Sequence, residues 1–292
     1  MTSPTTHPEG ARDATPDQCP ARPRALLASA CLTPWGGAAT GLPGAAPVEL
    51  PKVIGFVTSR FSPLVHAVAT DCLGAPGSDR DRIGAAGSRT GIVLATMFGD
   101  TVTLDTATRR LTEGQVHSPL LFFQSVTTSV LGHLGRQYGI TGPVTCLSVA
   151  RHGVAEALFS ADLMLDEDEV DRVLVIGVEL AANERATWVH RRASGPEGLA
   201  ALPDGDCAAA LLLAREPDPD GAPTPLVAAD GTTAAGPPQE DVRYRRFGWL
   251  ASLVAASEAV RPAPGAASAP TPVRVPGPYG YVVGPALSGS AA

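Results

Sequence analysis

Two segments of this sequence are apolar over the length of a strand without alternating with polar residues. They are "VDRVLVIGVEL" (170–180) and "CAAALLLAREP" (207–217). In a strand with one solvated face, apolar and polar residues alternate, whereas a strand covered by helices on both faces is apolar throughout. Both segments are therefore predicted to be buried strands of a layered α/β domain, with helices on each side of the sheet.

Other segments supply further strands and the covering helices. Strands are predicted for "RALLASACLTPWG" (24–36), "TGIVLATMFG" (90–99) and "VTCLSV" (144–149). Helices are predicted for 59–73, for Phe122–Tyr138 ending at Gly139, and for Val154–Leu165. The last of these helices has an apolar face made of Val154, Ala157, Leu158, Ala161 and Leu165.

Composition divides the chain into three parts. Residues 1–23 are rich in Pro, Thr and Asp and are predicted to be a disordered tail. Residues 24–217 carry all the strands and helices named so far. Residues 218–292 are Pro/Ala-rich connectors with one apolar helix (247–260) and a short strand pair (273–283) turned at Pro276-Gly277.

Charge, cysteine spacing and hydropathy exclude several classes of protein. The net charge is -7, and no basic run with interleaved aromatics predicts a nucleic-acid groove. The five cysteines lack metal-ligand spacing, and no phosphate-binding glycine loop is present, so we expect no metal and no cofactor. The N-terminus has no signal-peptide core and no window is long enough to span a membrane, which predicts a soluble, cytoplasmic protein.

The segment "TCLSVARHGVAEAL" (145–158) runs from a strand through the turn Arg151-His152-Gly153 into a helix. Junctions of this kind often hold a nucleophile, because the turn exposes one side chain and the helix N-terminus stabilises its anion. Here the turn carries Arg151, whose guanidinium stays protonated and cannot attack a substrate. We call the turn Arg151-His152-Gly153 with the start of its helix the elbow.

The order of these segments resembles the N-terminal half of a β-ketoacyl synthase of the thiolase-like superfamily. The resemblance covers about residues 24–217 and implies a thiolase-like half, layered α-β-α with a mixed sheet. It rests on the opening strand with its Pro-x-Gly turn, the long helix followed by Gly-Pro before the elbow strand, "VDRVLVIGVEL" and "PDGDCAAALLLAREP".

The resemblance implies that this chain lacks a condensing site of its own. The nucleophilic cysteine of the family lies eight residues after the proline of Gly-Pro, and counting from Pro143 gives Arg151. The family also takes two catalytic histidines from its C-terminal half. No His or Cys follows residue 217 here, and we expect the remaining residues, about 75, to be too few for that half. No catalytic residue is therefore expected.

Several other side chains near the elbow are candidates for a pocket or an interface, each with a structural alternative. Cys146 is either a buried thiol or a substitute nucleophile, and His152 either faces a pocket or partner or is structural. Glu179 is expected to hold backbone or interface contacts, and Asp204 and Asp206 to form a turn. Ser148 does not match the GxSxG pattern of a serine hydrolase.

The predicted long helix carries further candidates for a tunnel or an interface, with core burial as the alternative for the two phenylalanines. They are Phe122, Phe123, Gln124, Thr127 and Thr128.

Two functions follow from the resemblance. The first is a non-catalytic subunit of the chain-length-factor type, which pairs through "VTCLSV" with an active ketosynthase in type II polyketide or polyene biosynthesis and shapes the acyl tunnel. The second is a remnant enzyme that transfers, cyclises or isomerises a chain bound to a carrier protein, with Arg151 and His152 as polarising groups. The expected partners are a ketosynthase or a second copy, and an acyl carrier protein, and a homodimeric carrier scaffold stays open.

Overall fold

The computed structural model describes residues 23–34, 49–116, 118–194, 198–216, 226–229, 245–260, 272–278 and 280–284. The predicted disordered tail, apart from residue 23, and most of the two Pro/Ala-rich connectors lie outside the described residues. The described strands form one mixed sheet in the order β3-β2-β4-β5-β1-β6-β8-β7. Their bounds are Arg24–Leu32 (β1), Thr90–Thr96 (β2), Val144–Ser148 (β3), Arg172–Glu179 (β4), Cys207–Ala214 (β5), Leu226–Ala229 (β6), Val273–Val275 (β7) and Tyr281–Gly284 (β8).

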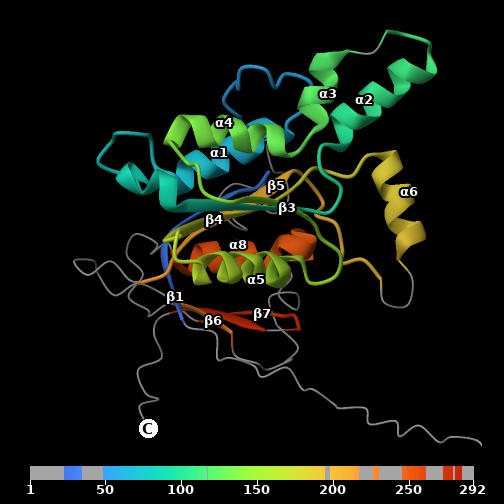
Figure 1. Cartoon of the computed structure of the whole chain (residues 1–292). Coiled ribbons are helices and arrows are strands. Elements are labelled where there is room, and N and C mark those ends of the chain that lie inside the picture. Colours follow the sequence, from blue (N-terminus) through green and yellow to red (C-terminus); the bar gives the residue numbers. More distant parts are fainter. Residues whose placement is uncertain are drawn as a thin grey trace, which may run out of the picture.

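Three neighbouring strands, β3, β2 and β4, run parallel, and β5 and β1 continue the sheet in antiparallel pairs. Helices cover both faces of this part of the sheet (Figure 1). Helices α1 (Phe61–Leu73) and α4 (Thr128–Tyr138) lie on one face, and α5 (Gly153–Asp166) and α8 (Ala251–Val260) on the other. The mixed sheet between two helical layers is the predicted architecture.

The apolar runs of β4 and β5 divide between two cores, one on each face of the sheet. Val173 and Val175 of β4 pack in the core around α5 and α8. Leu174 and Ile176 alternate with them and pack in the core around α1 and α4. The continuous apolar pattern therefore reflects burial on both faces, as predicted. The predicted apolar face of α5 is also confirmed, because all five of its residues are buried.

Helix α8 lies inside the molecule. It packs against β1 and β5 on one side and against β7 and β8 on the other, so that the small C-terminal strands form a further layer below it (Figure 1). Residues Ala251 to Ser257 are all buried. A helix that is apolar around its whole circumference needs such a surrounded position. The predicted C-terminal helix and strand pair are present, and they complete the core on the α5 face.

The long helix predicted from Phe122 to Tyr138 is wrong, because the segment forms two helices. Helix α3 (Pro119–Ser125) ends at Val126, whose backbone is extended with φ -82° and ψ 111°, and α4 then begins at Thr128. The β-branched run Val126-Thr127-Thr128 has low helix propensity. The Gln124 Oε1 acceptor also receives the backbone N–H groups of Val57 and Thr58 at 3.1 and 3.0 Å, which holds α3 to a separate segment.

Among the described α-helices, two were not predicted, α2 (Thr101–Thr112) and α6 (Glu184–Ala193). Both are polar, with Thr103 and Ala186 as their respective buried residues. Each begins at a capping side chain, Asp100 accepting from Thr103 N at 3.0 Å and Asn183 accepting from Ala186 N at 2.8 Å. These two caps are the sequence signal that would have identified the helices.

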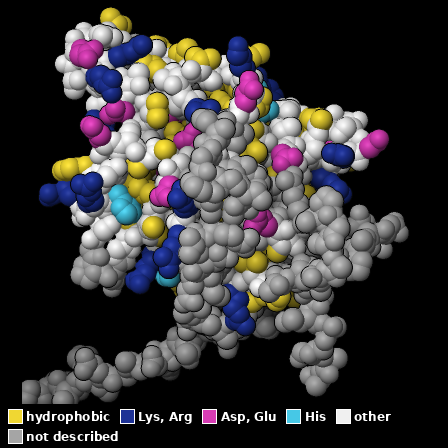
Figure 2. Space-filling model, turned by 180° about the vertical axis from the view of Figure 1, so that it is seen from behind, with side chains coloured by type: hydrophobic (Ala, Val, Ile, Leu, Met, Phe, Trp, Pro, Cys, Tyr) yellow, Lys and Arg dark blue, Asp and Glu magenta, His cyan; other side chains and the backbone are white. Residues whose placement is uncertain are grey.

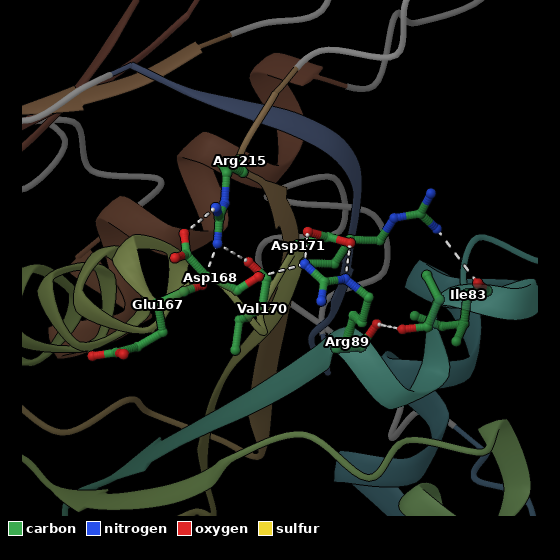
Figure 3. A network of polar contacts seen from close by, with 10 residues as sticks. Ile83, Arg89, Glu167, Asp168, Val170, Asp171 and Arg215 are labelled. Atoms are coloured by element: carbon green, nitrogen blue, oxygen red, sulfur yellow. Dashed lines mark hydrogen bonds and ion pairs between the residues drawn. The ribbon is translucent and has the colours of Figure 1, made fainter.

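An arginine network fixes the connection between α5 and β4 (Figure 3). Arg89 binds both carboxylate oxygens of Asp171, at 2.5 Å from Nε and 2.7 Å from a terminal nitrogen. Arg215 donates to the carbonyl oxygen of Val170 at 2.8 Å and to that of Glu167. The acidic connection between α5 and β4 is thus tied to the start of β2 and the end of β5. These strand ends lie at the end of the sheet opposite to the elbow.

The glycine of the Gly-Pro that precedes β3 is required by packing. A Cβ on Gly142 would lie 2.4 Å from the carbonyl oxygen of Thr90, whereas a Cβ on the exposed Gly132 of α4 would meet nothing within 4 Å. We expect Gly142→Ala to lower the free energy of unfolding by about 1–3 kcal/mol through overpacking. Gly132→Ala, the matched control, should raise it by about 0.5–1 kcal/mol because the unfolded chain loses entropy. Urea unfolding followed by circular dichroism measures both, and equal effects would contradict the packing argument.

Candidate functional site

The elbow joins the end of β3 to the start of α5 by a short turn. Val149 N donates to the carbonyl oxygen of Thr96 at 3.0 Å, which continues the pairing with β2 into the turn. Gly153 begins the helix in a space closed by neighbours. A Cβ there would lie 2.7 Å from Cγ2 of Val149 and 2.8 Å from Cε3 of Trp249. The turn therefore needs glycine at 153, and its shape is set by packing.

Arg151 and His152 occupy the turn itself. Arg151 is exposed and His152 is half-buried. Within the described part of the chain, neither side chain makes a hydrogen bond or an ion pair, and His152 does not cap α5. The positive end of the helix dipole repels a cation, so the guanidinium of Arg151 is stable only where water solvates it. A nucleophile–base pair is not formed at these two positions.

A buried carboxylate, Glu179 at the end of β4, holds the frame around the elbow. Its Oε2 accepts from Met97 N at 2.7 Å and from the Trp249 indole Nε1 at 3.1 Å, and its Oε1 accepts from Phe98 N at 3.3 Å. It is 2 % exposed. Burial raises the pKa of Glu179 to about 7, although these donated hydrogen bonds favour the anion. The backbone contacts predicted for Glu179 are present.

A chain of hydrogen bonds links the elbow to α6. Ala200 N donates to the carbonyl oxygen of Ala150 at 3.1 Å, and the carbonyl oxygen of Ala200 lies 2.9 Å from Nε2 of His190. The His190 ring also meets Phe98 edge to face, with ring centroids 6.4 Å apart. On the other side, Gly277 of the turn before β8 packs against Ala155 of α5. The elbow is thereby braced by segments distant in sequence.

Strand β3 lies at an edge of the sheet. Among the described strands it pairs with β2 alone. Ile92 N donates to the carbonyl oxygen of Pro143, and Val149 N to that of Thr96, so positions 143 and 149 face β2. Because the hydrogen-bonding side alternates along a strand, the amides of Val144, Cys146 and Ser148 face away from β2. The strand is short and flanked by exposed apolar residues, and an edge of this kind favours pairing with another strand.

Of the predicted site residues, Thr127, Cys146 and Ser148 lie at β3, whereas Gln124 is buried elsewhere. Thr127 Oγ1 lies 3.1 Å from Sγ of the half-buried Cys146, and Ser148 Oγ donates to the carbonyl oxygen of Met97 at 3.3 Å. Gln124 is 2 % exposed and anchors the segment 53–58. Phe122 and Phe123 are 61 % and 45 % exposed, so core burial does not explain them. Thr128 begins α4 beside the break between the helices.

Helices α2 and α3 project from the body as an arm (Figure 1). They enclose a pocket of about 150 Å³ that sequence reasoning missed. Its lining is largely apolar and consists of Leu104, Ala107, Thr108, Arg110, Leu111, Val116, Ser118, Leu121, Phe122 and Ser125. The apolar surface of the arm continues through Phe123, whose ring lies 5.3 Å from that of Phe56. The exposed Ile54 and Val57 extend this surface.

Charges of both signs are mixed over the described surface in the view of Figure 2. No group of three or more His, Cys, Asp or Glu side chains in the described residues is arranged to hold a metal ion. Among the same residues, no helix is both long and apolar enough to cross a membrane.

The mixed sheet with helices on both faces and the strand–turn–helix elbow form a fold that solved ketosynthase structures share. The chain is similar to the ishigamide ketosynthase/chain length factor, at 17% identity with a TM-score of 0.54 over 71% of this chain and 66% of that chain. It is also similar to a chain of the ketosynthase (ApeO) in complex with its chain length factor (ApeC) from Xenorhabdus doucetiae, at 17% identity with a TM-score of 0.50, covering 90% of this chain and 98% of that chain.

A third similar structure is a beta-ketoacyl synthase from Burkholderia phymatum STM815, at 15% identity with a TM-score of 0.51, covering 77% of this chain and 69% of that chain. No protein-family model matches the sequence, and no curated protein matches it. At these identities the comparisons establish the fold, as the sequence resemblance predicted.

The raised pKa of Glu179 predicts how stability depends on pH. Between its ordinary value of 4.5 and about 7 the unfolded chain releases the proton that the folded chain keeps. The group therefore makes the folded state less stable as pH rises through this window, by at most about 3 kcal/mol. Between pH 5 and pH 8, the free energy of unfolding measured in urea should fall more for the wild type than for Glu179→Gln, because the glutamine does not titrate. Parallel losses in the two proteins would contradict this account.

Proposed function

We propose that this protein is a non-catalytic ketosynthase-like subunit of the chain-length-factor type, which pairs with an active ketosynthase in type II polyketide or polyene biosynthesis. The observation that carries the proposal is the elbow of a ketosynthase fold with Arg151 exposed where the resemblance implies the nucleophile. Two of the similar structures contain a chain length factor, in one case in complex with its ketosynthase.

The physical chemistry of the elbow supports a role without covalent catalysis. A thiolate at this position gains stability from the helix dipole, whereas a guanidinium gains none and stays protonated. Arg151 and His152 contact no base or acid in the described part of the chain. The remnant-enzyme function has no such observation in its favour, because it requires a polarising pair aimed at a bound substrate.

The edge strand β3 supports pairing as the means of assembly. Its outward amides are those of Val144, Cys146 and Ser148, which a strand from a ketosynthase subunit would satisfy. The contact between Thr127 and Cys146 sets the junction of α3 and α4 against β3. Phe122 and Phe123 are exposed on the helix that precedes this junction, and we propose that they border the acyl tunnel of the complex.

Blocking the edge of β3 tests the pairing. We expect Ser148→Asp to prevent association with the partner ketosynthase, because pairing would bury the new carboxylate at this exposed strand edge without a counter-charge. Ser88→Asp, a charge on an exposed serine of the 3-10 helix η1 (Gly84–Arg89), is the matched control and should pair normally. Co-expression, co-purification and light scattering report the complex. A native chain that stays monomeric and binds no ketosynthase would refute the pairing.

A reconstituted reaction tests the division of roles. The protein alone, incubated with acyl- and malonyl-loaded carrier protein, should form no carbon–carbon bond, because Arg151 cannot accept an acyl group. Addition of the partner ketosynthase should produce condensation, and the product length should change when Phe123→Ala removes an exposed aromatic side chain from the proposed tunnel. Mass spectrometry of the carrier-bound products measures both effects. Condensation by the isolated chain would show that it is an enzyme in its own right.

A further inference from the structure

The pocket between α2 and α3, which we call the arm pocket, is walled by large apolar side chains that remain in contact with water. Leu104 and Leu111 of α2 line it, although they are 49 % and 53 % exposed. Leu121 lines it from α3 and is buried. An apolar ligand that displaces water from such a surface is bound with a gain in free energy.

The volume of the arm pocket limits the ligand to a small molecule. The pocket holds about 150 Å³. A protein cavity of this size that is lined by leucine, isoleucine and phenylalanine side chains binds benzene. A drug-sized ligand, which occupies a pocket of about 300 Å³ or more, does not fit. The arm pocket therefore accepts an apolar body of about six carbon atoms, such as a phenyl ring or a branched alkyl group.

Two hydroxyl groups of the lining are already occupied by the chain itself. Thr108 Oγ1 donates to the carbonyl oxygen of Leu104 at 2.8 Å, and Ser125 Oγ donates to that of Phe122 at 2.8 Å. A hydroxyl that has given its proton to the backbone cannot donate it to a ligand. The interior of the pocket is therefore less polar than its composition indicates, which disfavours a sugar or a polyol as the ligand.

Arg110 supplies a charged group for one end of the ligand. Among the described lining residues it alone carries a charge, and its side chain is exposed. Within the described part of the chain, its guanidinium makes no hydrogen bond or ion pair. A guanidinium presents its donors in a planar fork that matches the two oxygens of a carboxylate. A ligand with an apolar body and a carboxylate therefore satisfies both the wall of the pocket and Arg110.

The neighbouring arginine shows that this unpaired charge is particular to position 110. A terminal nitrogen of Arg109 donates to Asp105 at 3.0 Å, one turn earlier in α2. Nε of Arg185 in α6 lies 3.4 Å from the other oxygen of the same carboxylate. Asp105, the acid inside α2, is thereby paired with two arginines and does not compete with a ligand for Arg110.

We infer that the arm pocket binds a small organic acid, with its aromatic or branched alkyl body against Leu104, Leu111 and Phe122 and its carboxylate on Arg110. This inference goes beyond the proposed function and does not rest on it, because both walls of the pocket belong to this chain. A bound acid contacts both helices of the arm, so its binding stabilises the arm in the described arrangement.

Titration of the full-length chain with benzoate, followed by saturation-transfer nuclear magnetic resonance, tests the site. Arg110→Gln should weaken the benzoate affinity by about threefold, as loss of an exposed ion pair does. Added salt should weaken binding to the wild type more than binding to Arg110→Gln. Arg109→Gln removes the adjacent, already paired charge and is the matched control, which should bind as the wild type does. Benzyl alcohol, which has no charge, should bind the wild type and Arg110→Gln equally.

A second pair of measurements tests the apolar part of the site. Ala107→Leu adds a larger side chain to the wall of the pocket and should abolish binding of both benzoate and benzyl alcohol. Its circular dichroism should equal that of the wild type, because residue 107 is not in the core. Acetate carries the carboxylate without the apolar body, and it should bind the wild type about tenfold more weakly than benzoate.

Several results would overturn the inference without touching the proposed function, which Ser148→Asp tests separately. If the wild type does not bind benzoate, or Ala107→Leu binds it equally well, the acid does not occupy the arm pocket. If Arg110→Gln and Arg109→Gln weaken binding equally, no carboxylate lies on Arg110. If the complex with the ketosynthase no longer binds benzoate, the pocket is part of the subunit interface, which also overturns the inference.

Discussion

Burial of both faces of β4 and β5 is the constraint from which the rest of the structure follows. These strands supply alternating residues to two cores, so helices must cover the sheet above and below. On one side α1 and α4 suffice. On the other, α5 needs a neighbour, and α8 fills that place from the far end of the sequence. The described C-terminal helix and strands therefore belong to the core that supports the elbow.

The same constraint leaves the sheet with an edge at β3. Central strands are satisfied by their neighbours, but β3 pairs with β2 alone among the described strands and has outward amides at Val144, Cys146 and Ser148. Proteins usually protect such an edge with charge, proline or a covering element. Strand β3 carries no charged residue, and its Val144 is exposed. The edge of β3 thus favours pairing with a strand of another subunit, and this is the physical basis of the proposed pairing.

How far the sequence predicts the structure depends on how local each signal is. The strands and the α5 face follow from apolar periodicity, which is local and strong. The break between α3 and α4 does not, because Gln124 receives hydrogen bonds from Val57 and Thr58, which are remote in sequence. Helix α6 was missed because its polar face hides its periodicity and only the Asn183 cap marks its start. The turn that carries Arg151 was predictable from the strand and helix on either side of it. The links from Ala150 through Ala200 to His190 depend instead on tertiary contacts.

The shape of the elbow does not depend on the side chain at position 151. Gly153 is required by the approach of Val149 and Trp249, and Trp249 in turn donates to Glu179. Glu179 also fixes the backbone at Met97 and Phe98, beside the start of α2. All these contacts are structural, and none involves the side chain at 151. A nucleophile can therefore be replaced by a solvated arginine without loss of the turn, because packing around Gly153 and the buried Glu179 maintain the fold. The geometry of the elbow is therefore compatible with the proposed pairing, in which the reaction takes place in the partner subunit.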